Sequence, residues 1–476
     1  MKLKNIFKPL ALGLVLTASS CSDLLDVQPR QSIDSATALT SEDAIRAAVN
    51  GVYDVLQSTF LYGRDLVAIP EALADNGRAT NKSGRLVAEY QNQATNAHFQ
   101  IWERAYNAIN QLNLILEALP KATAVPVATR DSFEGQASML RALLYFELAR
   151  CYGYEPKVVV TQSDRGTVPL HKKGVLDLSQ IERLPRATIA ETYDFIYSDL
   201  TNAIAKLSTV TLSTAYANKG AANALFSRVA LYRGDYENAI KYANAALASG
   251  IGKFQTKDAY VGAWRVANHP ESMFEIVYQT NENIGVNTSL QTTYTTLVQL
   301  GNTATTGGFG DLVPTAALLA AFEPGDVRRN LYERGTAGRG TAEIECTKFF
   351  GRSGAVNLDN IPVIRISEMY LNRAEAYALT GKETEALADV NTIRTRAGLE
   401  AKTGLTGQAL INEIANQRRI EFAFEGHRFF DLKRRGQDII KDAPAQNLAY
   451  TDFRILSFIP NREIQANSNL KQNVGY

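Results

Sequence analysis

The segment that decides the fold is EMYLNRAEAYALTGKETEALADVNTIRTR, residues 368–396. Its apolar residues recur at helical spacing on both sides of Gly381. This pattern predicts two helices joined by a turn at the glycine. Small residues such as Ala374 and Ala386 stand where the two helices would meet, and they allow antiparallel helices to approach closely.

A second segment, residues 225–247, has the same order of helix, glycine turn and helix around Gly234. Both segments have the packing pattern of a tetratricopeptide-like hairpin. The spacing between them is not a single repeat period. The sequence therefore predicts a scattered helical-repeat scaffold rather than a continuous tandem array.

Further helices are predicted from apolar residues that recur every three or four positions. The predicted ranges are 40–57, 99–119, 132–152, 190–207 and 219–233. The fold class is therefore mainly α.

Two stretches differ from this helical background. Residues 249–354 are rich in glycine, threonine and asparagine, with strand-like alternation only in short pieces such as 272–278. Residues 75–96 form a second long polar loop. Loops of this length inside a compact protein are uncommon unless they bind something.

These patterns predict a division of the mature chain into three parts. A helical scaffold covers residues 40–248, a loop-rich variable region with a few short strands covers 249–354, and residues 355–476 pack with the first part as one domain. We expect the variable region to bind the ligand.

The amino terminus has the features of an export signal. A basic start and a short apolar core precede small residues and Cys21. The sequence predicts that residues 1–20 are a lipoprotein-type signal peptide, that Cys21 carries lipid, and that 21–39 form a flexible tether. The alternative is ordinary secretory cleavage nearby, with Cys21 incidental.

Charge and cysteine content exclude other classes. The chain has 50 Lys and Arg against 49 Asp and Glu, which gives no basic surface for nucleic acid. After Cys21 only Cys151 and Cys346 remain, too few for a disulfide framework. Whether these two cysteines pair is left open.

The group of residues that most resembles a catalytic or metal site is Glu421, Glu425, His427 and Asp431. The two glutamates stand one helical turn apart, as do the histidine and aspartate, and this spacing could hold a metal. Only one histidine is present, however, and the arginines at 418, 419 and 428 flank the acids. Pairing between buried acids and arginines is therefore the preferred interpretation. We predict no catalytic residue, no metal site and no cofactor.

Five segments, in this order, resemble the SusD/RagB family of Bacteroidetes. They are CSDLLDVQP (21–29), GQASMLRALLYFELARCYG (135–153), IPVIRISEMYLNRAEAY (361–377), RRIEFAFEGHRFFDLKR (418–434) and the carboxy-terminal segment 459–476. The last one departs from the family pattern, with Ser468 and Val474 where proline is usual.

The resemblance implies a helical fold with tetratricopeptide-like hairpins packed against a variable region. It also implies a nutrient-binding lipoprotein, anchored on the outer face of the outer membrane. Its partner would be a SusC-like, TonB-dependent transporter, and its cargo an oligosaccharide or a peptide. The alternative function is a helical-repeat scaffold or adhesin that only binds other proteins.

Ligand contacts are expected from the two long loops, because aromatic faces and polar side chains recognise sugars and peptides. The candidates are Asp75, Asn76, Arg78, Arg85, Tyr90, Trp264, Tyr294 and Phe309. For each aromatic residue the alternative is ordinary core packing. Trp102 is expected in the core, on the apolar side of its helix.

Overall fold

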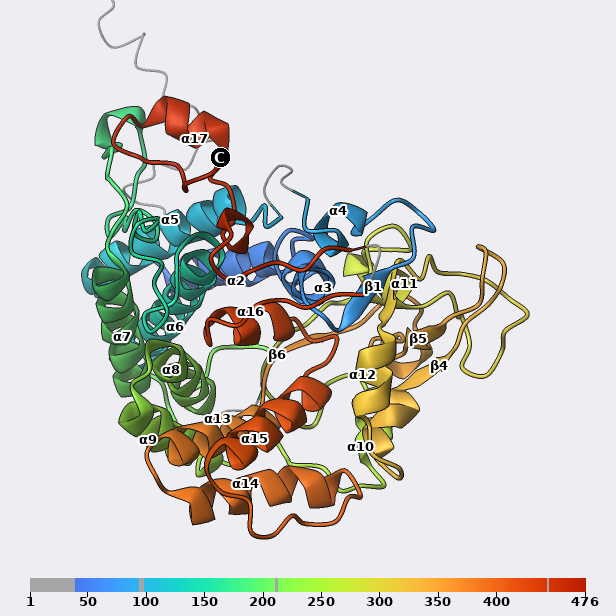
Figure 1. Ribbon diagram of the computed structural model, residues 1–476. Helices are drawn as coiled ribbons and strands as arrows, with labels where there is room; N and C mark the ends of the chain where they lie inside the picture. Colours follow the sequence, from blue (N-terminus) through green and yellow to red (C-terminus); the bar gives the residue numbers. More distant parts are fainter. Residues whose placement is uncertain (1–38, 94–97, 210–212, 443–444) are drawn as a thin grey trace, which may run out of the picture.

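The computed structural model describes residues 39–93, 98–209, 213–442 and 445–476. Its helices form an arc that partly surrounds the remaining elements (Figure 1). The amino-terminal helices are α2 (Glu42–Leu56), α3 (Asp65–Leu73), α4 (Val87–Tyr90), α5 (Trp102–Ala118), α6 (Val127–Tyr152) and α7 (Ile189–Lys206). The hairpin helices and their neighbour are α8 (Lys219–Arg233), α9 (Tyr236–Leu247), α13 (Ile366–Leu379), α14 (Glu383–Arg396) and α15 (Gly407–Glu421). Short helices are α10 (Tyr260–Ala263), α11 (Leu290–Tyr294), α12 (Ala316–Ala321), α16 (Arg428–Lys433) and α17 (Asn461–Ala466).

The predicted hairpins are confirmed. Helices α8 and α9 turn at Gly234 with φ of 77°, and α13 and α14 turn at Gly381, also with φ of 77°. Both values lie in the left-handed region, which glycine enters without steric cost.

The two hairpins are far apart in the sequence but adjacent in space. Helix α9 packs against α13, so that α6, α7, α8, α9, α13, α14 and α15 follow one another along the arc (Figure 1). The expectation of a scattered scaffold holds for the sequence only. In space the variable region is an insertion, and the helices on either side of it form a continuous array.

Other predicted helices also form, with small changes at their ends. Helix α2 begins after Ser41, whose hydroxyl accepts a hydrogen bond from the Ala44 N–H, as an N-cap residue does. Helix α6 starts five residues earlier than predicted, directly after Pro126. Among the helices of the described residues, none combines the length and the apolarity that crossing a membrane requires.

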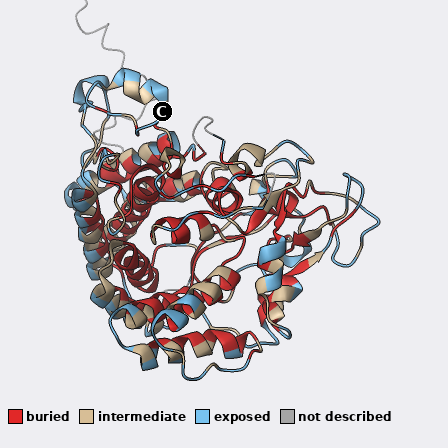
Figure 2. Cartoon of the chain, in the orientation of Figure 1, coloured by how far each residue is buried: buried red, intermediate tan, exposed pale blue. Residues whose placement is uncertain are grey.

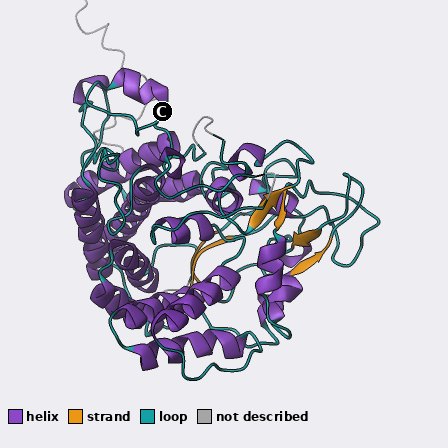
Figure 3. Ribbon diagram, in the orientation of Figure 1, coloured by secondary structure: helices purple, strands orange, loops and turns teal. Residues whose placement is uncertain are grey.

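The strands are short; most of those visible in Figure 3 lie opposite the helical arc, whereas β6 lies near the centre of the molecule. They are β1 (Gly77–Ala79), β2 (Ser272–Ile276), β3 (Leu312–Pro314), β4 (Tyr332–Arg334), β5 (Ile344–Cys346) and β6 (Ile361–Arg365). They pair as three antiparallel two-stranded ladders, β1 with β3, β2 with β6 and β4 with β5. The first ladder joins the loop 75–96 to the variable region.

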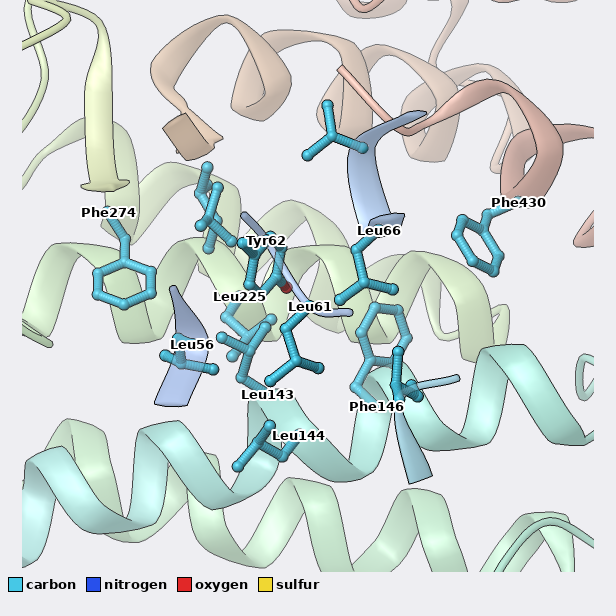
Figure 4. Packing of buried hydrophobic residues seen from close by; sticks show 14 of the residues in the cluster. Leu56, Leu61, Tyr62, Leu66, Leu143, Leu144, Phe146, Leu225, Phe274 and Phe430 are labelled. Atoms are coloured by element: carbon cyan, nitrogen blue, oxygen red, sulfur yellow. The ribbon is translucent and has the colours of Figure 1, made fainter. Parts of the chain in front are cut away.

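The main hydrophobic core lies on the inner side of the arc, where Figure 2 shows mostly buried residues. Leu61 and Tyr62 from the segment after α2 contribute to it together with Leu143 of α6 and Leu225 of α8 (Figure 4). The same cluster includes Phe274 of the variable region and Phe430 of α16. One core therefore includes residues of all three predicted parts, and the boundaries between these parts remain a prediction.

Candidate functional site

The acids that resemble a catalytic group are used for internal ion pairs. Glu421 is fully buried, and its Oε1 accepts hydrogen bonds from Arg365 Nη1 at 3.0 Å and Arg396 Nη2 at 2.5 Å. Burial would raise the pKa of this carboxyl, but the charges of Arg396, Arg365 and Arg328 outweigh burial and hold the pKa well below its usual value. Glu421 is therefore a permanently ionised structural group.

The second half of this group is also internally paired. Asp431 accepts two hydrogen bonds from Arg418 Nε at 2.8 Å and one from Arg434 Nε at 2.9 Å. His427 stacks on Phe422, and burial holds the pKa of the imidazole well below 6.5. No group of three or more metal-ligating side chains occurs in the described part of the chain. The prediction of acid–arginine pairing is confirmed. Glu421, however, is neutralised by Arg365 and Arg396 and not by the arginines that flank it in the sequence.

Two of those flanking arginines instead pair with Asp75, one of the residues predicted to contact the ligand. Arg428 Nε and Arg419 Nη2 lie 2.6 and 3.3 Å from the carboxylate of Asp75. Burial raises the pKa of Asp75, but the hydrogen bond and charge of Arg428 outweigh it and the pKa is lowered. Asn76 is fully buried, accepting from Arg419 Nε at 2.8 Å and donating to Glu71 at 3.1 Å. Asp75 and Asn76 thus fasten the end of α3 to the carboxy-terminal helices.

Three of the predicted aromatic residues are core residues. Tyr294 is 0% exposed and packs edge-on against Phe424 with ring centroids 4.8 Å apart. Trp264 is 6% exposed and packs against Phe349. Tyr90 is 4% exposed, and its backbone carbonyl accepts a hydrogen bond from Lys441. A ligand cannot stack on these rings in this conformation, so core packing, the alternative for each of them, describes their place in the fold.

The remaining predicted residues, Arg78, Arg85 and Phe309, come together on the loop-rich side of the molecule. The β1–β3 ladder places Arg78 opposite Val313. A few residues further on, the Arg85 guanidinium lies over the half-buried Phe309 ring, 4.4 Å from its centroid. Two loops that are more than 200 residues apart in the sequence therefore form one surface.

Asp311 fixes this arrangement and was not predicted. Its backbone carbonyl accepts from the Thr80 N–H at 2.9 Å, and its buried carboxylate accepts from Ser83 Oγ at 2.6 Å. The same carboxylate lies 3.6 Å from Arg85 Nη1. Burial raises the pKa of the Asp311 carboxyl. The position of this acid between Gly310 and the start of β3 is its only sequence signal.

A third loop completes the surface. The Arg339 guanidinium also lies over Phe309, 4.5 Å from the ring centroid, and its Nε donates to the Gly308 carbonyl at 2.9 Å. Glu343 pairs with Arg78 at 3.0 Å. We call the following six residues, of which Asp311 is buried, the loop site: Arg78, Arg85, Phe309, Asp311, Arg339 and Glu343.

Two clefts lie elsewhere, on the part of the arc near the carboxy terminus. One has a volume of about 490 Å³ and is lined by α5, α17 and the segment around His171. The other, of about 520 Å³, lies on the far side of the ion pair between Glu103 and Arg462. Trp102 contributes to the walls of both but is only 4% exposed, which confirms its predicted place in the core. Neither cleft includes a residue of the loop site.

Comparison with known proteins places this architecture in a family. A family model described as SusD family matches residues 345–476, and one described as starch-binding associating with outer membrane matches residues 23–231. The chain belongs to the SusD family. It is 26% identical to a SusD-like protein of Formosa agariphila over the full length of both chains.

Two further relatives support this assignment. The crystal structure of a putative sugar binding protein from Bacteroides vulgatus superposes with a TM-score of 0.79 and 29% identity, covering 92% of this chain and 100% of that one. The starch-binding protein SusD of Bacteroides thetaiotaomicron is 34% identical over 125 residues, which is 25% of this chain and 22% of that protein. The mainly α fold and the resemblance to SusD/RagB proteins are confirmed.

Proposed function

We propose that this SusD family member is a surface lipoprotein that captures a glycan at the loop site and delivers it to a SusC-like, TonB-dependent transporter. The observation that carries the proposal is the β1–β3 ladder, which joins the two long loops, together with the contact between Arg85 of one loop and Phe309 of the other. The described relatives that are named for sugar or starch binding favour a glycan over a peptide.

Binding is a better account of the loop site than catalysis. Its two carboxylates face cations: Asp311 is 3.6 Å from Arg85, and Glu343 is 3.0 Å from Arg78. Hydrolysis of a glycoside needs one carboxyl group that stays protonated as a general acid beside a second carboxylate. The Asp311 carboxylate is only 1% exposed, so it cannot stand beside a bound glycosidic bond as one of these two groups.

The glycan site can be located by substitution. Purified mature protein would be screened against immobilised and soluble oligosaccharides by calorimetry, and the strongest ligand used for all variants. We expect Arg78→Ala and Phe309→Ala to weaken binding, because both residues belong to the loop site. Ile181→Ala is the matched control, since Ile181 is 52% exposed and lines the cleft between α5 and α17. Loss of affinity in the Ile181 variant alone would place the ligand in that cleft and refute the loop site.

The anchor and the partner are tested separately. Cys21 lies outside the described residues, and the proposal assigns it a lipid that holds the protein on the outer membrane. Cys21→Ala should therefore move the protein to the soluble fraction when the transporter is deleted. Mild detergent extraction from the native organism should recover the transporter with this chain in equal amounts. Repeated recovery of the chain alone, with the transporter expressed, would favour the scaffold or adhesin function instead.

A further inference from the structure

Two guanidinium groups converge on one aromatic ring at the loop site. The Cζ atoms of Arg85 and Arg339 lie 4.4 and 4.5 Å from the Phe309 ring centroid. An aromatic ring attracts cations through the negative potential of its faces. Phe309 therefore positions two arginines and is not a bare ring face for stacking on a neutral sugar.

The two positive charges at this ring are not neutralised by acidic side chains at the surface. Within the described part of the chain, Asp311 is the only carboxylate within 4 Å of either guanidinium, and its side chain is 1% exposed, whereas that of Arg85 is 32% exposed. Arg339 is exposed and has no carboxylate within 4 Å among the described residues. A molecule that approaches from solvent thus meets guanidinium groups, while the compensating acid lies behind them.

Only some of the N–H groups of these arginines donate hydrogen bonds within the protein. Arg339 donates through Nε to Gly308, and its two terminal nitrogens have no hydrogen-bond partner in the described part of the chain. Arg85 Nη1 is buried and faces Asp311 at 3.6 Å, which is too long for a hydrogen bond, so a ligand would have to bind the other guanidinium nitrogens of this partly exposed side chain. The planar fork of N–H donors on an arginine matches the two oxygens of a carboxylate or a sulfate.

The two arginines are also held in place, so that little order is lost on binding. The loops that carry Phe309 and Arg339 are joined by the hydroxyl pair Thr306–Thr336 at 2.6 Å. The backbone fits tightly at Gly308, where an added Cβ would lie 1.9 Å from the Thr295 carbonyl oxygen. A preorganised pair of donors binds more strongly than two mobile side chains.

We propose that the loop site selects acidic glycans, and that Arg85 and Arg339 bind a carboxylate or a sulfate on the sugar. This inference rests on the proposed function and adds the chemical class of the glycan. Hydrogen bonds to a charged group predict that loss of either arginine weakens binding of an acidic oligosaccharide by about 10- to 100-fold.

The test uses the mature protein and paired oligosaccharides that differ only in charge. Oligogalacturonate is compared with its carboxyl-reduced form, and a sulfated galactan oligosaccharide with its desulfated form, by calorimetry. We expect one or both acidic forms to bind at least 10-fold more tightly than their neutral partners. Higher ionic strength should weaken the binding, because salt screens exposed charges.

The variants are Arg85→Gln, Arg339→Gln and Arg339→Lys. Both glutamine variants should lose most of the preference for the charged form, and the lysine variant should lose less, because it keeps the charge without the fork. Arg104→Gln is the control, since Arg104 is an exposed arginine of α5 that lies outside the loop site. Thermal unfolding of Arg339→Gln should match the parent protein, so that a loss of binding is not a loss of fold.

The outcomes separate this inference from the proposed function. Binding of neutral glycans with equal or higher affinity, or unchanged affinity in Arg339→Gln, overturns the acidic preference and leaves glycan capture in place. Failure to bind either class of glycan overturns both. Tight binding of the carboxylated form only, or of the sulfated form only, supports the inference and identifies the anion.

Discussion

Replacing Arg365 with methionine tests whether the buried ion network maintains the fold. The Arg365 side chain is 1% exposed and lies within 2.6 Å of Glu271, 2.7 Å of Glu425 and 3.0 Å of Glu421. Methionine fills a similar volume but leaves three buried carboxylates with fewer cationic partners. Removing one partner of a buried pair costs about 3–5 kcal/mol, because the remaining charge stays desolvated.

The expected change in melting temperature follows from the size of the protein. Unfolding entropy of about 2.1 cal/mol/K per residue gives about 1 kcal/mol/K for a chain of this length, 476 residues. A loss of about 3–5 kcal/mol therefore lowers the melting temperature by about 3–5 °C. Differential scanning calorimetry at pH 7 measures this shift directly.

Two further variants make the result specific. Arg462→Met is the matched control, because its ion pair with Glu103 is more than half exposed on both sides and contributes little. Arg365→Lys keeps the charge but provides fewer donors, so its melting temperature should lie between those of the parent and the methionine variant. A melting temperature of Arg365→Met equal to that of the Arg462 control would show that the network contributes no net stability.

Three other changes test separate parts of the reasoning. Burial raises the pKa of Glu71 from 4.5 to about 7, so the contribution of this carboxyl to stability is full below pH 4.5 and is lost as the pH rises through 7. Glu71→Gln should remove this loss, measured by urea titrations at pH 5 and 8. The control Glu103→Gln should leave the loss in place. Gly381→Ala should lower the free energy of unfolding by about 1–2 kcal/mol in urea, because an L-residue is strained at φ of 77°. The strain is conformational, since nothing lies within 4 Å of the added Cβ. The control Gly262→Ala in α10 should cost nothing comparable. Tyr294→Ala should lower stability by about 3–5 kcal/mol in chemical denaturation, as expected for a residue with 0% exposure, and retention of full stability would contradict its place in the core.

The scaffold could be predicted from the sequence because its signals are local. Helical periodicity and a glycine at the turn suffice for the hairpin at 368–396, and the structure has helices within one or two residues of that range. The packing of α9 against α13 could not be predicted, because it depends on how the chain returns after an insertion of more than 100 residues. Periodicity gives no information about contacts over that separation.

The candidate site could be predicted only as a pair of loops. The polar composition of 75–96 and of the variable region indicated the two segments, and the β1–β3 ladder joins them. Within these loops, composition could not separate Phe309, which is half-buried at the surface, from Tyr294, which is fully buried. Tyr294 stands between threonines and Phe309 between glycines, both common in loops, and only the tertiary packing decides which ring solvent reaches.

The difference between buried scaffold residues and exposed loop residues explains why family membership predicts the fold of the scaffold better than the identity of the ligand. The segment 418–434 supports the resemblance, and its charged residues are buried in ion pairs: Arg418 pairs with Asp431 in the same segment, and Glu421 pairs with Arg396 of α14. These pairs determine how the carboxy-terminal helices pack, whatever the ligand is.

Some residues of the loop site lie outside the segments that the family models match, although Arg78 and Arg85 lie inside one of them. Phe309 and Arg339 lie between residues 231 and 345, in the part of the chain that neither family model matches. Arg339 is held by the Gly308 backbone carbonyl of the neighbouring loop and has no ion pair with the scaffold among the described residues. Arg339 can therefore be substituted without breaking an ion pair of the scaffold. Substituting Arg339 should accordingly alter which glycan binds and leave the melting temperature unchanged.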